Sequence, residues 1–179
     1  MELSLPPKQV LYLFACASPS TQNLQDFIVL AQEKAWDVCV FTTPNALNFI
    51  NVPLIEALTK HPVRSEYKIP GTEDVFPKGD VTVVAPATFN TVSKLALGIA
   101  DNLALSQMCK AMGLKQPFVI APCIPNHYAN HPAFKKNLNV LKKAGIKVLH
   151  DPKHYPAPMI VPWGKILDAI EVNNKRHIT

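Results

Sequence analysis

The chain has 179 residues, of which 48% are apolar and 17% charged, so it can build a sizeable core and is not a disordered protein. Its longest apolar runs, such as residues 118–121, are too short to cross a bilayer, and residues 1–7 lack the basic region and apolar core of a signal peptide. The formal net charge of +5 is not gathered into a basic stripe with interleaved aromatic residues, which argues against a nucleic-acid partner.

We therefore expect one domain over residues 1–179, located in the cytoplasm, with no membrane partner and no nucleic-acid partner. The four cysteines show no paired spacing, so they predict neither a disulfide framework nor a metal site. We expect reduced, mostly buried thiols at these positions, which are Cys16, Cys39, Cys109 and Cys123.

The first eighty residues predict two strands, each followed by a helix, and then an irregular segment. Branched and aromatic apolar runs indicate the strands, and apolar residues at helical spacing indicate the helices. In chain order these are a strand over 9–15, a helix over 21–35, a strand over 37–42 and a helix over 46–58 that Pro53 interrupts. Residues 61–80 are rich in proline, glycine and charge, which favours irregular structure.

The remainder of the chain continues this alternation. The expected elements are a strand over 81–85, a helix from 88 to 105 or beyond, a strand over 117–121, a loop over 122–132, a helix over 132–144 that ends at Gly145, a strand over 146–149, a proline-rich loop over 151–162 and a helix over 163–172. Strands that alternate with helices favour a parallel sheet with right-handed crossovers. We predict an α/β fold: a three-layer Rossmann-like or flavodoxin-like open parallel sheet with helices on both faces.

The residues after the third predicted strand favour a cofactor site. Thr88, Asn90 and Thr91 lie where this strand gives way to a helix, and ligands of open α/β sheets bind outside the carboxyl ends of the strands. Hydroxyl and amide groups beside a helix N-terminus suit a phosphate or the polar edge of a heteroaromatic ring. The absence of a GxGxxG fingerprint counts against a standard NAD fold.

A longer motif then gives a family resemblance. It consists of Pro86-Ala87-Thr88-Phe89-Asn90-Thr91, then Lys94, then Gly98-Ile99-Ala100-Asp101-Asn102-Leu103. This run resembles the signature of the homo-oligomeric flavin-containing cysteine decarboxylases, which include phosphopantothenoylcysteine decarboxylases and lantibiotic peptidyl-cysteine decarboxylases. The resemblance implies an FMN cofactor, a modified FMN being the alternative. It also implies a homotrimer or a homododecamer built from trimers, in which the helix expected to carry residues 98–103 resembles that of the family.

The resemblance also implies which residues contact the flavin. They follow four successive strands and are Ala17, Ser18, Ser20, Thr43, Ala87, Thr88, Phe89, Asn90, Thr91 and Cys123. The alternative for a lone serine such as Ser18 is that it caps a helix and does not contact the flavin. Phe89 departs from the small residue usual in the family, so it either packs on the isoalloxazine ring or crowds it.

The catalytic groups of the family are altered in this chain. Thr72 stands at about the position of the family histidine. The nearest histidine in the sequence is His61, which we expect to be an exposed loop residue. The alternative is that His61 moves into the site. Pro125 stands at the position of the family asparagine and can donate no side-chain hydrogen bond. Asn126 and His127, one and two positions on, are our candidate catalytic residues, and His127 with Tyr128 brings new acid–base groups to the same loop. The alternative is that these residues belong to an ordinary surface loop.

From this resemblance we expect an FMN-binding flavoprotein. It would be a flavin-dependent enzyme, a decarboxylase-like lyase or an oxidoreductase, acting on a small-molecule or peptide thiol or on another small substrate. Two alternatives remain at this point: a non-catalytic flavin-binding or regulatory subunit, and a scaffold that no longer binds flavin.

Overall fold

The computed structural model describes residues 8–157 and 161–174. Five parallel strands form one sheet in the order β2-β1-β3-β4-β5. Their bounds are β1 Val10–Ala15, β2 Asp37–Thr42, β3 Val81–Ala87, β4 Phe118–Pro122 and β5 Lys147–Val148. The chain runs outward from β1 to β2 and then crosses back to place β3 on the other side of β1, which is the flavodoxin-like strand order. The β1/β3 boundary is therefore the switch point of the sheet.

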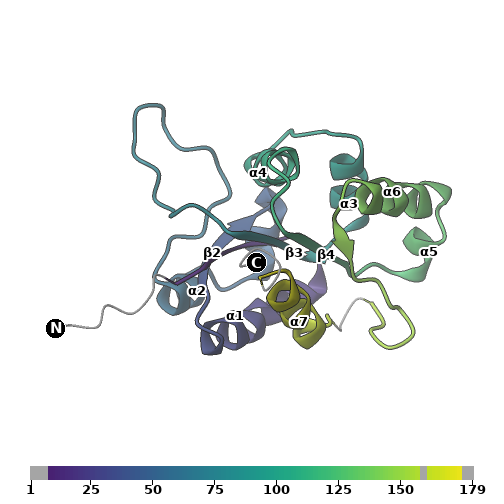
Figure 1. Cartoon of the computed structure of the whole chain (residues 1–179), viewed down its shortest axis with the longest axis horizontal. Helices are drawn as coiled ribbons and strands as arrows, with labels where there is room; N and C mark the ends of the chain where they lie inside the picture. Colours follow the sequence, from purple (N-terminus) through teal and green to yellow (C-terminus); the bar gives the residue numbers. More distant parts are fainter. Residues whose placement is uncertain (1–7, 158–160, 175–179) are drawn as a thin grey trace.

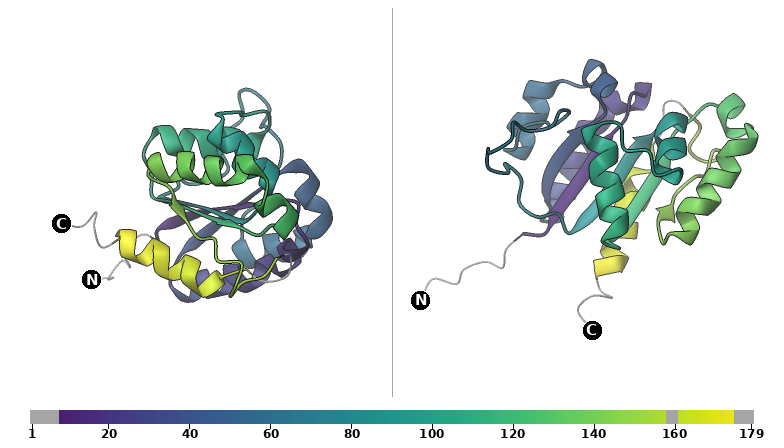
Figure 2. Two further views of the ribbon diagram at one scale, coloured as in Figure 1. Left: turned by 90° about the vertical axis from the view of Figure 1, so that its right-hand side faces the viewer. Right: turned by 90° about the horizontal axis from the view of Figure 1, so that it is seen from above.

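Helices cover both faces of the sheet (Figures 1 and 2). One face is covered by α1 (Leu24–Glu33), α2 (Val52–Thr59) and α7 (Trp163–Asn174), and the other by α3 (Phe89–Ala96), α4 (Leu103–Gly113) and α6 (Pro132–Lys143). Because strand side chains alternate between faces, successive residues of β1 enter different cores: Leu13 packs toward α1 and Phe14 toward α4. The predicted three-layer α/β fold is confirmed. Within the described residues, none of the helices is both long and apolar enough to cross a membrane.

The helix predicted from residue 88 to 105 is wrong. It is two helices, α3 and α4, separated by a loop in which Gly98 has a φ of 71°. That left-handed conformation ends the first helix, and glycine adopts it without the clash that a Cβ would meet. Asn102 starts the second helix, because its side chain accepts a hydrogen bond from the Leu105 N–H at 3.0 Å. Residues 98–102 thus form a connection rather than a helix face.

Other boundaries also differ from the sequence prediction. Short 3-10 helices, η1 (Pro19–Asn23) and η2 (Pro44–Phe49), stand where continuous α-helices were expected to begin. Pro53 does not interrupt α2 but lies in its first turn, where no intrahelical N–H is needed. The loop expected over 122–132 contains the single turn α5 (Asn126–Ala129). Residues 61–80 are irregular as predicted, apart from a bridge between Phe41 and Arg64, and they project from the sheet in Figure 1.

The buried hydroxyl of Thr82 gives a stability prediction. Thr82 is fully buried in β3, and its Oγ1 has no hydrogen-bond partner among the described residues. We expect Thr82→Val to raise the free energy of unfolding by roughly 1 kcal/mol, because it removes an unpaired polar atom at nearly constant volume. Thr59→Val is the matched control: the Thr59 hydroxyl donates to the Ile55 carbonyl at 2.9 Å, so its loss should destabilise the chain. Urea denaturation measures both, and a destabilised Thr82→Val would contradict the prediction.

The cysteines give a pH prediction. All four are free, and all but the half-buried Cys109 are buried. Burial, with a smaller contribution from Asp37, raises the pKa of the Cys39 thiol from 9.0 to about 12. Below pH 9 this thiol is protonated in both states; above pH 9 the unfolded chain releases the proton and the native chain does not, so stability falls as pH rises.

We expect the Cys39 thiol alone to lower the free energy of unfolding by roughly 1 kcal/mol between pH 9 and pH 10. Urea denaturation at both pH values measures the loss. Cys39→Ala should show a smaller loss over this interval than the unmodified chain, whatever its stability at neutral pH. Equal losses in the two proteins would contradict the assignment to Cys39.

Candidate cofactor site at the carboxyl ends of the strands

Four strand ends meet at one edge of the sheet, because the strands are parallel. Ala17 follows β1, Thr43 follows β2, Thr88 follows β3 and Cys123 follows β4. Backbone hydrogen bonds tie these turns together: the Thr43 N–H donates to the Ala15 carbonyl and the Cys123 N–H to the Ala87 carbonyl, each at 3.0 Å. The edge that carries the predicted flavin residues is therefore continuous across the β1/β3 switch point, where ligands of doubly wound sheets bind.

Two adjoining hollows open along this edge. One, of about 410 Å³, extends toward β4 and α5; the other, of about 480 Å³, extends toward β2 and α4. Ala17, Thr88 and Asn90 line both. Every predicted flavin-contacting residue lines one or both of them except Ser20 and Ala87, which are buried just behind the surface.

The hollow toward β2 is polar. Its walls include Thr43, Asn45, Thr91, Lys94 and Asn102 in addition to the three shared residues. Thr88 caps α3, because its Oγ1 accepts a hydrogen bond from the Thr91 N–H at 3.3 Å and lies 3.1 Å from the Thr91 Oγ1. Lys94 forms an ion pair with Asp101. The N-terminus of an eight-residue helix, with hydroxyl groups beside it, suits an anionic oxygen.

The hollow toward β4 is lined mainly by apolar and aromatic side chains, and its lining contains no charged residue among those described. Phe89 stacks on Tyr128, with ring centroids 5.4 Å apart and an interplanar angle of 25°, and meets His131 edge-on at 5.3 Å. Pro19, Ile124 and Pro125 complete the apolar wall. Flat, apolar walls of this kind suit a planar ring.

A chain of polar groups lies beneath the apolar hollow. The Ser18 Oγ is 3.1 Å from the Ser20 Oγ, which in turn is 3.2 Å from the Cys123 Sγ. Burial raises the pKa of the Cys123 thiol, and the hydrogen bond with Ser20 opposes that rise. Ser18 precedes η1, but its side chain makes no capping hydrogen bond, so the alternative that it serves only as a cap is wrong.

The candidate catalytic residues lie beside this site rather than in it. Asn126 and His127 belong to α5, are exposed, and line neither hollow, whereas the next residue, Tyr128, does line the apolar one. The His127 ring contacts Tyr128 at a centroid distance of 4.6 Å. The structure thus places Tyr128, and neither candidate, against the cavity.

The two positions considered for the family histidine lie elsewhere. Thr72 is exposed and donates its hydroxyl hydrogen to the Ile69 carbonyl at 2.7 Å. His61 lies in the irregular segment after α2, as expected, but the expectation that it is exposed is wrong: its ring is partly buried and its Nε2 lies 2.8 Å from Asp37 Oδ1. Because Asp37 begins β2, this pair holds His61 at the amino end of the sheet, at the edge opposite the residues predicted to contact the flavin.

Sequence reasoning missed several lining residues. Pro19 and Ile124 line the apolar hollow without having been predicted, and Lys94 and Asn102 line the polar one without having been assigned to the flavin. Lys94 and Asn102 stand in the motif that carries the resemblance, so that motif could have pointed to them. Nothing in the local sequence distinguishes Pro19 or Ile124 from ordinary turn and core residues.

The residues present fit a flavin mononucleotide. The polar hollow offers the α3 N-terminus, hydroxyls and amides to a phosphate and a polyol chain, and the apolar hollow offers flat walls to a ring system. Phe89 forms part of the apolar wall instead of closing it, since its ring is already packed against Tyr128 and His131.

Comparison with known proteins agrees with this arrangement. A family model described as Flavoprotein matches residues 4–175. The coenzyme A biosynthesis bifunctional protein CoaBC of Bacillus subtilis is 31% identical over 136 residues, which cover 73% of this chain and 33% of that protein. The chain thus spans about a third of the length of this relative.

Solved structures show the same fold. A PPC decarboxylase complexed with pantothenoylaminoethenethiol superposes with a TM-score of 0.75 at 20% identity, over 94% of this chain and 100% of its own. The FMN-dependent cysteine decarboxylase SpaF superposes with a TM-score of 0.70 at 23% identity, over 79% of this chain and 83% of its own. The chain belongs to the flavoprotein family that includes the flavin-dependent cysteine decarboxylases.

Proposed function

We propose that this chain binds FMN at the carboxyl ends of its strands. The observation that carries the proposal is the junction of a polar hollow and an apolar hollow through Ala17, Thr88 and Asn90 at the β1/β3 switch point. Thr88, Thr91 and the α3 N-terminus would hold the phosphate, and Phe89 with Tyr128 would border the ring. The FMN dependence of the structurally similar SpaF supports the choice of flavin.

We further propose a flavin-dependent enzyme, a lyase or an oxidoreductase, that acts on a thiol, a cysteine-type compound or another small substrate. A bound flavin supplies the electron transfer. The apolar wall of Phe89, Pro125 and Tyr128 would keep water from the reacting atoms, and the Tyr128 phenol would hold a proton at its Oη. The relative solved with pantothenoylaminoethenethiol supports a substrate of the thiol class.

A non-catalytic flavin-binding or regulatory subunit is the second candidate. One observation favours it: Asn126 and His127 are exposed and line neither hollow, while Pro125 offers the apolar hollow a ring without a donor. In that case the same site would hold FMN without turning over a substrate.

We also propose that the chain assembles as a homotrimer or a larger oligomer. The loop between α3 and α4 supports this, because Leu97 is 70% exposed and Ile99 40% exposed beside the polar hollow. Exposed apolar side chains next to a ligand site are typical of surfaces that meet a partner. Sedimentation velocity gives the state directly, and a monomer with and without FMN would contradict the proposal.

The first experiment adds excess FMN to the purified chain, desalts it, and records the absorption spectrum. Flavin bands that survive desalting support the cofactor proposal, and a colourless protein overturns it. A second assay then incubates the FMN-loaded chain with a cysteine-terminated peptide or with phosphopantothenoylcysteine. Carbon dioxide release or flavin reduction supports an enzyme of the thiol class. If the flavin is retained but neither carbon dioxide release nor flavin reduction is seen, the non-catalytic candidate is favoured.

A further inference from the structure

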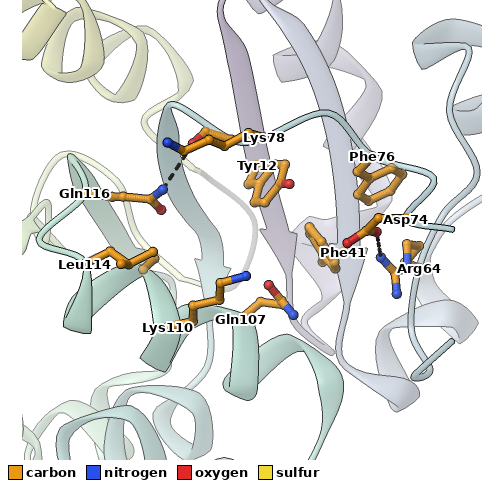
Figure 3. Close-up of a pocket in the computed structure, with 12 residues that line it drawn as sticks. Tyr12, Phe41, Arg64, Asp74, Phe76, Lys78, Gln107, Lys110, Leu114 and Gln116 are labelled. Atoms are coloured by element: carbon orange, nitrogen blue, oxygen red, sulfur yellow. Dashed lines mark hydrogen bonds and ion pairs between the residues drawn. The ribbon is translucent and has the colours of Figure 1, made fainter. Parts of the chain in front are cut away.

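A separate hollow lies on the sheet face toward α4, away from the two flavin hollows (Figure 3). It has a volume of about 320 Å³ and shares no lining residue with the other two. Its walls come from Tyr12 in β1 and Phe41 near the end of β2, from the irregular segment 61–80, from α4, and from the turn before β4. Nothing in the proposed flavin chemistry uses it.

The floor of this hollow is aromatic and fixed. Tyr12, Phe41 and Phe76 pack against one another, with Phe41 edge-on to Tyr12 at 5.1 Å and to Phe76 at 5.0 Å. The Tyr12 hydroxyl donates to the Pro77 carbonyl at 2.6 Å, which ties the ring to the irregular segment. A Cβ on Gly79 would lie 2.8 Å from the Tyr12 ring, so the glycine allows the backbone to close on that ring. The floor therefore exists before any ligand arrives.

The wall above this floor carries an excess of positive charge. Arg64, Lys78 and Lys110 line it, and Asp74 is its one acidic residue among those described. The Arg64 guanidinium lies 5.6 Å from the Phe41 centroid and 5.4 Å from the Phe76 centroid, and its Nη1 is 3.0 Å from Asp74 Oδ1. Asp74 thus balances Arg64, which leaves the charges of Lys78 and Lys110 to act on whatever enters.

The cations come from two separate segments, residues 61–80 and α4, and surround one space. Figure 3 shows Lys110 and Gln107 extending from α4 toward the space beside Tyr12, while Lys78 lies on the opposite rim near Gln116. The Gln116 Nε2 donates to the Gly79 carbonyl at 3.1 Å, so this amide is held in place on the rim. A concave site of one charge sign attracts the opposite charge more strongly than scattered surface lysines do.

We propose that this hollow is a second ligand site, for a small planar anion: a single aromatic or heteroaromatic ring that bears a carboxylate or a phosphate. The aromatic floor accepts the ring, and Lys78 and Lys110 accept the anionic group. The volume of about 320 Å³ is near the lower limit of small-molecule pockets, which favours a ligand with a single ring.

Calorimetric titration of the FMN-saturated chain tests the proposal, with benzoate and phenyl phosphate as anionic probes and benzyl alcohol as the uncharged one. We expect the anions to bind in the low millimolar range and benzyl alcohol at least roughly fivefold more weakly. Lys78→Gln/Lys110→Gln should weaken the anions roughly fivefold or more while FMN retention is unchanged. Lys135→Gln/Lys136→Gln, which removes the same charge from the exposed side of α6, is the matched control and should bind as the unmodified chain does.

Two results would overturn the proposal. One is the absence of binding heat with both anions, and the other is equal weakening by the two double variants, which would show only an effect of net charge. If there is no binding heat and Lys78→Gln/Lys110→Gln also changes the sedimentation coefficient, the hollow is a contact between subunits instead. Because FMN retention is measured separately, failure here and failure of the flavin proposal are distinguishable.

Discussion

Replacing Ala17 by leucine is expected to weaken FMN binding by roughly 10- to 100-fold. Ala17 is the half-buried residue after β1 that lines both hollows, so a larger side chain there would fill the junction through which they connect. Overpacking of this kind costs about 1–3 kcal/mol in well-packed surroundings. Fluorescence titration of the apo-protein with FMN measures the dissociation constant, since flavin emission changes on binding.

Ala57→Leu is the matched control for this prediction. It adds the same atoms at an exposed position in α2, outside both hollows, and should leave the FMN dissociation constant unchanged. Urea denaturation of the two variants without flavin separates a binding effect from a folding effect. If Ala17→Leu binds FMN as tightly as the unmodified chain, the ligand does not cross the junction at Ala17, and the proposed placement of FMN is wrong.

The sheet and the positions of its strands could be predicted from the sequence because buried parallel strands have a strong local signal. Residues 37–42, predicted as a strand, form β2 with the same bounds, and the first four strands are all found where predicted to within two residues at either end. Short runs of β-branched and aromatic residues, each followed by apolar residues at helical spacing, are compatible with few folds other than a parallel α/β sheet. Strand order is not local: the sequence predicts an open parallel sheet of Rossmann-like or flavodoxin-like type, and only the structure shows that the order is β2-β1-β3-β4-β5.

The failures lie where one residue decides a boundary. Apolar spacing continues through residues 88–105, so periodicity alone cannot reveal the break; it depends on the positive φ of Gly98 and the cap at Asn102. The sequence predicts that Pro53 interrupts a helix, but a proline in the first turn of a helix is favourable. Asn51 provides the N-cap of that helix, because its side chain accepts a hydrogen bond from the Leu54 N–H at 3.2 Å. In both cases the backbone conformation, and not composition, determined the outcome.

Some residues of the candidate site could be predicted from the sequence and others could not. Residues that directly follow strands converge because the strands are parallel, so Ala17, Thr43, Thr88 and Cys123 could be placed together from the sequence. Residues of α5 could not, because it depends on the orientation of one helical turn that Tyr128 lines the apolar hollow and His127 does not. Orientation of a four-residue turn is set by packing, here by the stacking of Tyr128 on Phe89.

The same substitution at two glycines should have different effects on stability. At Gly79 an added Cβ would lie 2.8 Å from the Tyr12 Cγ, and Tyr12 cannot retreat easily because its hydroxyl is bonded to Pro77 and its ring packs on Phe41. We expect Gly79→Ala to lower the free energy of unfolding by about 1–3 kcal/mol through this clash.

Gly113 provides the control in the same protein. It is the exposed last residue of α4, and an added Cβ there would meet nothing within 4 Å. Gly113→Ala should therefore be neutral or raise the free energy of unfolding by up to about 1 kcal/mol, because alanine loses less backbone entropy in a helix. Urea denaturation of both variants gives the comparison, and equal stabilities would show that Tyr12 yields to the new methyl group. In that event the aromatic floor beside Arg64 is mobile rather than preformed, and the affinity expected for a planar anion there falls accordingly.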